Sequence, residues 1–382
     1  NYNAPSYTSN SATLTINPAS LTALVANQTK VYGADDPALS GIGVTLSGLI
    51  NRTVVTWNGN VAVDDNALTS NATALTRAAG ENVGVKNITA GTFSSASGNY
   101  SAPTFAGSPT LTISQASLTA LVANQSKLYG ADDPTLSGIG VTLTGLINRT
   151  VVTWNGNVAV DDNALTSNAT ALTRAAGETI GVRNITAGTF SAASTNYSAP
   201  SFTGSPTLTI NKANLIGSLA NQSKIYGADD PSLPSVSLNF INRAVSTWNG
   251  SVGVDDTGLV GTTLASLTRV AGENVGVRNI SAASFNALTG TSAGNYNAPS
   301  YTSNSATLTI NPASLTALVA NQTKVYGADD PTLSGIGVTP SGLINRTVVT
   351  WNGNVAVDDS ALTSNATALT RAAGENVGVK NI

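Results

Sequence analysis

The acidic residues of this 382-residue chain, 20 in all, recur at the same places in each of several repeats. In the first repeat they are Asp35, Asp36, Asp64, Asp65 and Glu81. Paired loop carboxylates are the ligands that a hard, oxygen-binding cation such as Ca²⁺ requires. These five residues are therefore the candidate calcium ligands, and a bound ion of this kind would stiffen the joints between domains.

Two other uses of the carboxylates are open. The Asp-Asp pairs fit turns, which Asp favours, with Lys30, Arg52 or Arg77 as ionic partners, and no Asp-x-Asp-x-Asp-Gly loop appears. Glycoside hydrolysis needs one pair of carboxylates about 5–10 Å apart in a cleft. Here the acids recur equally in every repeat, and an enzyme seldom needs equivalent sites in a row. We therefore assign no catalytic residue and expect no enzyme.

Each repeat carries a single tryptophan, and the four are Trp57, Trp154, Trp248 and Trp351. Their rings are candidates for stacking on the sugar rings of a glycan. A lone Trp in a small β domain is more often the anchor of the domain's core, and that is the prediction made here. Tyr32, Tyr100 and their equivalents are interpreted as partly buried rings whose hydroxyls reach the surface.

Composition excludes several classes of function. The chain contains neither Cys nor His, which removes the commonest nucleophile, base and metal ligands as well as any disulfide framework. A net charge of −3 without a basic patch argues against nucleic-acid binding. No apolar run is long enough to span a bilayer. Avoidance of Cys fits an exported chain, so we expect an extracellular or bacterial cell-surface location.

A repeat of about 97 residues organises the chain. The stretch Lys30–Pro37 returns three times, with its tyrosine at positions 32, 129, 226 and 326. The predicted domains are residues 1–16, the tail of a preceding repeat, followed by repeats at 17–113, 114–210, 211–310 (divergent) and 311–382 (cut short). Residues 1–88 and 295–382 align without gaps and differ at three positions, so a block of three repeats is itself duplicated.

Alternating apolar and polar side chains, broken by Gly, Asp and Pro, predict seven or so short strands per repeat. We expect strands at 20–30, 41–49, 54–63, 83–93, 100–105 and 110–113, with the Asn58-Gly59 turn inside the third. Residues 67–77 fit a strand or a short helix. Each Leu-Thr-Ile ending, of which Leu14–Ile16 is the first, indicates a half-buried strand.

The predicted fold class is mainly β: a tandem array of β-sandwich-like or β-grasp-like domains of about 97 residues. Only about four residues, such as Asn17–Ser20, connect one repeat to the next, too few for a flexible linker. The array is therefore expected to form an elongated, stiff rod.

Several short motifs in fixed order carry a resemblance to a known family. They are Tyr-Gly-x-x-Asp-Pro at Tyr32–Pro37, Arg-Ala-Ala-Gly-Glu-Asn-Val-Gly at Arg77–Gly84, then Asn-Tyr and the closing Leu-Thr-Ile. Together they resemble the MBG/YDG-type repeat domain of large bacterial surface adhesins and filamentous-haemagglutinin-like exoproteins. The resemblance covers all four repeats. It implies surface display, adhesion and spacing, and it supplies no catalytic residues.

These observations predict a structural repeat region of a giant extracellular or cell-surface adhesin or fibre, acting as a stiff spacer or filament shaft. Two alternatives stay open. One is a multivalent carbohydrate- or mucin-binding module with weak binding in each repeat. The other is a subunit of a laterally assembling sheath or matrix filament. The expected partners are neighbouring repeats, identical chains in a fibre, and host or matrix glycans; no cofactor is expected besides the calcium considered above.

Overall fold

The computed structural model describes residues 1–6 and 12–382, so residues 7–11 of the predicted tail of a preceding repeat lie outside the described residues. The chain forms two compact units. Unit 1 comprises Asn1–Gln125, Pro134–Ala176 and Arg183–Leu208; unit 2 comprises Ser126–Asp133, Gly177–Val182 and Thr209–Ile382. The division runs through the second repeat, because segments 126–133 and 177–182 belong to the unit that contains the third repeat.

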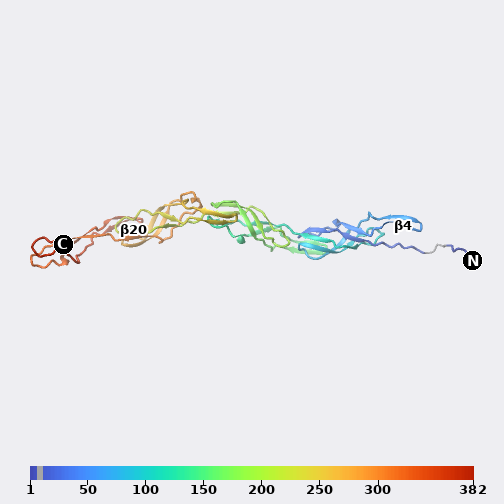
Figure 1. Ribbon diagram of the computed structural model, residues 1–382, viewed down its shortest axis with the longest axis horizontal. Helices are drawn as coiled ribbons and strands as arrows, with labels where there is room; N and C mark the ends of the chain where they lie inside the picture. Colours follow the sequence, from blue (N-terminus) through green and yellow to red (C-terminus); the bar gives the residue numbers. More distant parts are fainter. Residues whose placement is uncertain (7–11) are drawn as a thin grey trace. The chain divides into compact units, whose positions relative to one another are not determined.

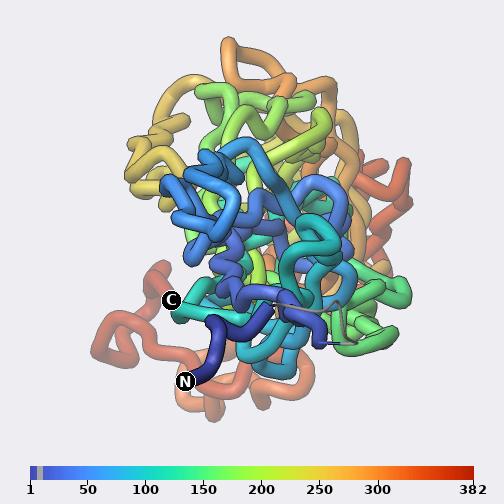
Figure 2. The backbone as a smooth tube through the Cα atoms, turned by 90° about the vertical axis from the view of Figure 1, so that its right-hand side faces the viewer, coloured from blue at the N-terminus to red at the C-terminus, as the bar shows by residue number. Residues whose placement is uncertain are grey.

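Short strands joined by turns make up each repeat (Figure 1). Figure 2 shows the path of the same backbone turned by 90°. The first repeat contains β1 (Thr22–Val25), β2 (Gln28–Val31), β3 (Val44–Ser47), β4 (Asn51–Thr56), β5 (Gly59–Asp64), β6 (Ala72–Arg77), β7 (Gly84–Phe93), β8 (Thr104–Phe105) and β9 (Thr110–Ser114). The second contains β10 (Thr119–Val122), β11 (Gln125–Leu128), β12 (Val141–Thr144), β13 (Asn148–Thr153), β14 (Gly156–Asp161), β15 (Ala169–Arg174), β16 (Gly181–Phe190), β17 (Ser201–Phe202) and β18 (Thr207–Asn211).

The later repeats follow the same order. The third contains β19 (Gly217–Leu219), β20 (Gln222–Ile225), β21 (Val236–Leu238), β22 (Asn242–Thr247), β23 (Gly250–Asp255), β24 (Leu264–Arg269), β25 (Gly276–Phe285) and β26 (Thr307–Asn311). The fourth contains β27 (Thr316–Val319), β28 (Val338–Ser341), β29 (Asn345–Thr350) and β30 (Gly353–Asp358). Among the described residues the helical elements are 3-10 turns at Leu39–Gly41, Leu136–Gly138, Ala293–Asn295 and Leu333–Gly335.

The mainly β class is thus confirmed, with sheet units repeating in tandem. The Asn58-Gly59 turn closes the hairpin β4–β5, in which Thr56 pairs with Gly59. The ambiguous stretch 67–77 supplies a strand, β6, and no helix. The expected strand 20–30 is two strands, because the chain passes from one sheet to another between Val25 and Gln28.

Two sheets enclose the core of the first repeat. One has the order β3-β1-β8 and the other β2-β9-β7-β6. Between them lie Ile42, which follows the 3-10 turn, and buried side chains from both sheets, namely Ala23, Val25, Ala72, Leu75, Ile88 and Phe93. In unit 2, the sheet β20-β26-β25-β24 packs likewise against the pair β19–β21, through Leu264, Leu267 and Ile280 with Leu219 and Val236. The repeats are therefore sandwich-like.

One predicted strand is absent. Leu14–Ile16 forms no strand, and Leu14 and Ile16 are 70% and 87% exposed. The equivalent residues one repeat later, Leu111–Ile113, belong to β9, which lies between β2 and β7 and buries Leu111 and Ile113. The printed sequence begins after the residues that would pair with Leu14–Ile16 in the same way, so an alternating pattern alone does not make a strand there.

Candidate functional site at the joints between repeats

A loop of one repeat holds a hairpin of the next. We call residues 32–37 and their equivalents the joint loop, and β13–β14 and its equivalents the joint hairpin. The hairpin forms because Asn155-Gly156 makes a tight turn in which Gly156 takes a φ of 113°. Thr153 fixes this turn, since its hydroxyl donates to the carbonyl of Gly156 at 2.7 Å and accepts from the amide of Asn155 at 3.1 Å.

The two aspartates of the first joint loop bind the backbone of the hairpin. The amide of Val152 donates to Asp35 at 2.8 Å, and the amide of Trp154 donates to Asp36 at 3.0 Å. In return, the amide of Asp36 donates to the carbonyl of Val152 at 2.9 Å. The Asp-Asp pair therefore recognises main-chain atoms of the next repeat.

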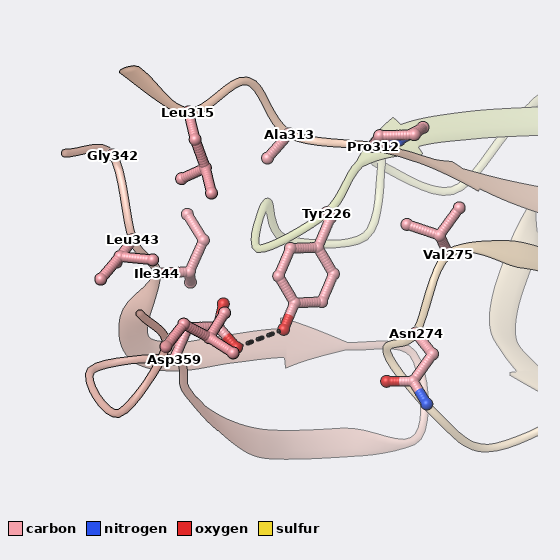
Figure 3. A pocket seen from close by; sticks show the side chains of 11 residues that line it. Tyr226, Asn274, Val275, Pro312, Ala313, Leu315, Gly342, Leu343, Ile344 and Asp359 are labelled. Carbon is pink, nitrogen blue, oxygen red and sulfur yellow. Dashed lines mark hydrogen bonds between the residues drawn. The ribbon is translucent and has the colours of Figure 1, made fainter. Parts of the chain in front are cut away.

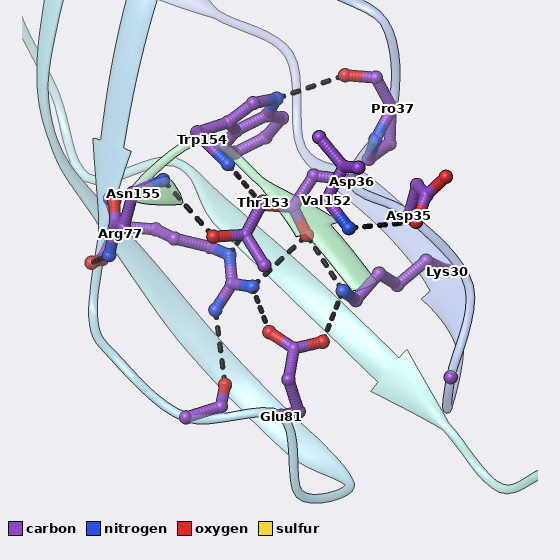
Figure 4. Close-up of polar contacts among 12 residues, drawn as sticks. Lys30, Asp35, Asp36, Pro37, Arg77, Glu81, Val152, Thr153, Trp154 and Asn155 are labelled. Carbon is purple, nitrogen blue, oxygen red and sulfur yellow. Dashed lines mark hydrogen bonds and ion pairs between the residues drawn. The ribbon is translucent and has the colours of Figure 1, made fainter. Parts of the chain in front are cut away.

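A buried cluster of four charged side chains lies behind the joint loop (Figure 4). Lys30 donates to Asp36 at 2.7 Å and to Glu81 at 2.5 Å. Arg77 binds Asp36 through Nε at 2.7 Å and also binds Glu81. Each of the four side chains is at most 6% exposed. Two cations and two anions balance one another, so the cluster is electrically neutral and fully paired.

Asp36 connects this cluster to the hairpin. Burial alone would raise the pKa of Asp36, but hydrogen bonds from Arg77, Lys30 and the amide of Trp154 outweigh burial and hold that pKa below its usual range. Asp36 therefore stays ionised at neutral pH and aligns the charged cluster with the next repeat. The ionic pairing of Asp36 with Lys30 and Arg77 is among those considered from the sequence, whereas Asp35 is bound by Arg149 of the next repeat.

The joint has an apolar core of its own, distinct from the core of the first repeat. Tyr32 and Ile113 of the first repeat pack with residues of the second, namely Ala116, Leu118, Val151, Val160 and Tyr197. Val151 and Tyr197 have no exposed surface. Because side chains of two repeats share this core, neither repeat buries its apolar surface there alone.

Two tyrosines from different repeats meet on one carboxylate. The rings of Tyr32 and Tyr197 are edge to face, with centroids 5.4 Å apart, and both hydroxyls donate to Asp162, at 2.9 and 2.6 Å. Burial and the hydrogen bond to Asp162 raise the pKa of Tyr32 to about 12. The interpretation of these hydroxyls as surface groups was wrong, because Asp162 of the next repeat, 130 residues from Tyr32, accepts hydrogen bonds from them.

The tryptophan prediction was also wrong in one respect. Trp154 packs on the core of the first repeat and not on the core of its own repeat. Its indole N–H donates to the carbonyl of Pro37 at 2.9 Å. The reason is that Trp154 follows directly on β13 at the tip of the joint hairpin, which carries the ring onto the preceding repeat. A glycan-binding role for the tryptophans stays untested.

Unit 2 contains the same joint twice. Tyr129 and Tyr296 both donate to Asp256, and Tyr226 donates to Asp359 at 2.9 Å. The amides of Trp248 and Trp351 donate to Asp133 and Asp230, each at 3.0 Å. On the exposed rim, Arg149, Arg243 and Arg346 bind Asp35, Asp132 and Asp229 at 2.8–2.9 Å, in unit 1 and twice in unit 2. The joint is therefore a repeated structural element.

In the part of the chain that the structure describes, the equivalents of Trp154, Tyr32 and Asp36 at the two ends have no neighbouring repeat bound to them. Their exposed fractions show how much surface the joint buries. Within the described residues, no joint loop of a preceding repeat is bound to the hairpin β4–β5, and Trp57 there is 92% exposed. Among the same described residues, no hairpin of a following repeat is bound to the last joint loop, and its Tyr326 is 70% exposed against 5% for Tyr32. In the same way the side chain of Asp330 is 51% exposed against 1% for Asp36.

A cavity of about 330 Å³ lies at the third joint, lined by residues that include Tyr226, Leu315, Ile344 and Asp359 (Figure 3). At the first joint the equivalents of Ile344 and Asp359 bind the hydroxyl of Tyr197. The sequence ends at Ile382, before the position that corresponds to Tyr197. The cavity therefore lies where a tyrosine ring fills the other joints, and it does not by itself indicate a ligand site.

The calcium candidates of the first repeat lie in two separate places. Asp35, Asp36 and Glu81 belong to the joint, and Lys30, Arg77 and Arg149 bind them. In the hairpin of the first repeat, Asp64 accepts from the amide of Asn66 at 3.2 Å, and Asp65 accepts from the hydroxyl of Tyr100 at 2.7 Å. Within the described part of the chain, no group of three or more acidic residues is arranged to hold a metal ion. Calcium binding is therefore untested.

Solved structures of other proteins resemble this chain at low similarity. Two solved structures of tandem domains cover much of the chain: the I9–I11 tandem of titin, with 8% identity over 77% of this chain and all of its own, and the eight N-terminal immunoglobulin domains of the Down syndrome cell adhesion molecule, with 11% identity over 84% of this chain and 45% of its own. Their TM-scores are 0.15 and 0.13, so neither bears on the fold or the function.

No curated protein matches the chain. The described residues include no helix whose length and apolar character would let it cross a membrane. Residues 21–110 match the family of MBG domains of the YGX type. This match contains Tyr32-Gly33-Ala34 at the start of the joint loop and confirms the resemblance seen in the sequence. Residues 21–110 are thus similar to the MBG domain of the YGX type, and their sequence motifs recur in the later repeats.

Proposed function

We propose that this chain is the stiff shaft of a bacterial surface or extracellular protein, a spacer that holds other parts of an adhesin or fibre away from the cell. MBG repeats are typical of surface proteins. A tandem array adds length in equal steps, and its stability is roughly a sum of repeat and neighbour terms. A role in spacing needs no active site.

The observation that carries the proposal is the joint itself. Domains that hinge freely meet through small, polar contacts. Here each joint hairpin is held by the preceding loop through backbone hydrogen bonds, a buried charged cluster and a shared apolar core. Bending at such a joint would expose the rings of Tyr32 and Tyr197 and separate Asp36 from the backbone of Trp154, so bending is costly.

The same contacts favour a spacer over a glycan-binding module. Stacking on a sugar needs a free face of the indole ring, but Trp154 and Trp351 are partly covered and donate their ring N–H groups to Pro37 and Pro231. The carboxylates of Asp36 and Glu81, which an enzyme would need free for acid–base chemistry, are occupied as well, because Lys30 and Arg77 bind them. We therefore place the structural role ahead of glycan binding and of catalysis.

The stiffness of the first joint can be measured from the distribution of distances between two spin labels, one in each repeat. The chain has no cysteine, so Thr45→Cys with Thr142→Cys places spin labels at equivalent, exposed positions of the first and second repeats, both in unit 1. The proposal expects one narrow distribution of distances, which broadens when Trp154→Ala is added. A broad distribution in the chain without Trp154→Ala would show a free hinge and overturn the proposal.

A further inference from the structure

The first and last strands of the first repeat run side by side in the same direction. Pairs between them follow in order along both segments: Ala19 with Tyr100, Thr22 with Thr104, Gln28 with Leu111 and Val31 with Ser114. The two segments leave one sheet and enter the other together, since β1 and β8 lie in one sheet while β2 and β9 lie in the other. The parallel pairing thus extends over nearly the whole of both segments.

This arrangement decides how tension acts on the repeat. The chain enters the repeat ahead of Ala19 and leaves it after Ser114. Pulling on the two ends therefore draws the two parallel segments past each other along their length. The hydrogen bonds between the segments run across the direction of pull, so they are loaded together and must break together. Pulling the same segments apart from one end would load the bonds one after another.

Side chains hold the pair against sliding. The hydroxyl of Ser114 donates to the carbonyl of Lys30, and the amide of Thr110 donates to the side chain of Asn27 at 2.9 Å. The strand β9 is also paired on its other edge with β7, so it cannot leave the sheet alone. Leu111 and Ile113 are buried, so sliding would drag apolar side chains out of the core.

The third repeat, within unit 2, has the same pairing. Ala213 pairs with Tyr296, Ile216 with Ser300, Gln222 with Leu308 and Ile225 with Asn311, all parallel. Its last strand, β26, is likewise paired on the other edge with β25. The arrangement therefore recurs in a repeat whose sequence has diverged in its loops.

We infer that the parallel first and last strands of each repeat form a shear clamp through which the chain bears tension along its length. This inference rests on the proposed function, because a spacer that anchors an adhesive part is pulled from its two ends. It adds a property that stiffness alone does not require: resistance to unfolding that depends on the direction of the force.

Single-molecule pulling on the full chain tests whether the force needed to unfold one repeat depends on the direction of pull. Ser20→Cys with Ser117→Cys provides handles that pull the two segments past each other. Ala26→Cys with Ser108→Cys provides handles at the same end of β2 and β9, which pull the pair apart. All four positions are exposed. Unfolding between the handles releases at most roughly 34 nm of chain in the first case and roughly 29 nm in the second, which identifies each event.

The clamp predicts an unfolding force at least twofold higher for the first pair of handles than for the second at the same loading rate. Equal forces, or a lower force for the first pair, would overturn the inference. Far-ultraviolet circular dichroism of both cysteine variants verifies that they are folded before pulling. The spin-label distances across the joint are a separate measurement, so a failed clamp and a failed spacer give different results.

Discussion

Gly33 approaches Ile147 of the next repeat so closely that a Cβ atom added to Gly33 would lie 2.7 Å from Cγ1 of Ile147. Gly33 also has a φ of +79°, which L side chains rarely adopt. The glycine of the Tyr-Gly-Ala motif is therefore required both by the backbone and by the neighbouring repeat. Gly130 and Gly227 meet Ile241 and Ile344 at the same distance of 2.7 Å.

Gly33→Ala is expected to destabilise the first joint by about 2–4 kcal/mol, from backbone strain together with the clash against Ile147. Gly327→Ala is a matched control, since Gly327 has a φ of +80° but nothing within 4 Å of an added Cβ. It should cost only the strain, about 1 kcal/mol. Scanning calorimetry of both variants measures the difference. Equal losses would mean that the contact with Ile147 contributes nothing.

Trp154→Ala should weaken the joint while Trp57→Ala should not. Trp154 packs on the first repeat and donates to Pro37, whereas Trp57 is 92% exposed. Because Trp154 is only partly buried, we expect a loss of about 2–3 kcal/mol for its removal and less than about 0.5 kcal/mol for Trp57. Thermal unfolding followed by circular dichroism compares the two. A matching loss in Trp57→Ala would contradict the joint role.

How much of this was predictable from the sequence differs between the fold and the joint. Alternation of side chains and the Asn58-Gly59 turn depend on neighbours in sequence, so the β class, the hairpin and most strands were predictable. The joint was not, because its contacts link residues far apart: Tyr32 to Asp162, Asp36 to Trp154. A pattern within one repeat is the same whether a side chain packs on its own repeat or on the neighbour.

One signal did point to the joint. Lys30–Pro37 is the most constant stretch of the repeats, and it combines a glycine, two acids and a tyrosine in what was interpreted as a turn. A turn needs the glycine and one acid, but it does not need Lys30 or the hydroxyl of Tyr32. The excess of specific side chains over what a turn requires is the feature that a contact with another repeat explains.

Asp36→Asn is expected to be the most damaging change within the charged cluster. It removes one anion and leaves Lys30 and Arg77 buried beside Glu81 alone, at an expected cost of about 3–5 kcal/mol. Asp330→Asn changes the equivalent residue, whose side chain is 51% exposed, and should lower the midpoint far less, because solvent screens this copy of the cluster. Calorimetric midpoints of the two variants give the comparison. Similar midpoints would show that burial of the cluster adds no stability.

Calcium is expected to leave the stability unchanged. At the joint, Ca²⁺ would have to displace Lys30 and Arg77 from Asp36 and Glu81, all of them buried. The midpoint of thermal unfolding should therefore be the same with added Ca²⁺ and with a chelator. A higher midpoint in Ca²⁺ would contradict this expectation, and Asp64→Asn would then show whether the ion binds near Asp64 and Asp65 instead.

Alkaline pH should open the joints before it unfolds the repeats. The folded-state pKa of Tyr32 is about 12, because of burial and the hydrogen bond to Asp162, and that of an unfolded tyrosine is about 10. Since the folded-state pKa is the higher one, the contribution of Tyr32 to the stability of the joint is complete below about pH 10. This contribution is lost as the pH rises from about 10 to 12.

Burial and the hydrogen bond to Asp256 raise the pKa of Tyr129 to about 12 as well. Burial and the hydrogen bond to Asp162 also raise the pKa of Tyr197. The distribution of spin-label distances across the first joint should therefore broaden between about pH 10 and 12. It should do so together with the rise in tyrosinate absorbance that comes from tyrosines ionising above the usual pKa of about 10. Tyr32→Phe keeps the ring but removes the titrating hydroxyl, so it should reduce this late absorbance and shrink the change in distances over the same range. Distances that stay narrow up to pH 12, or that broaden already near pH 8, would separate the joint from the ionisation of Tyr32.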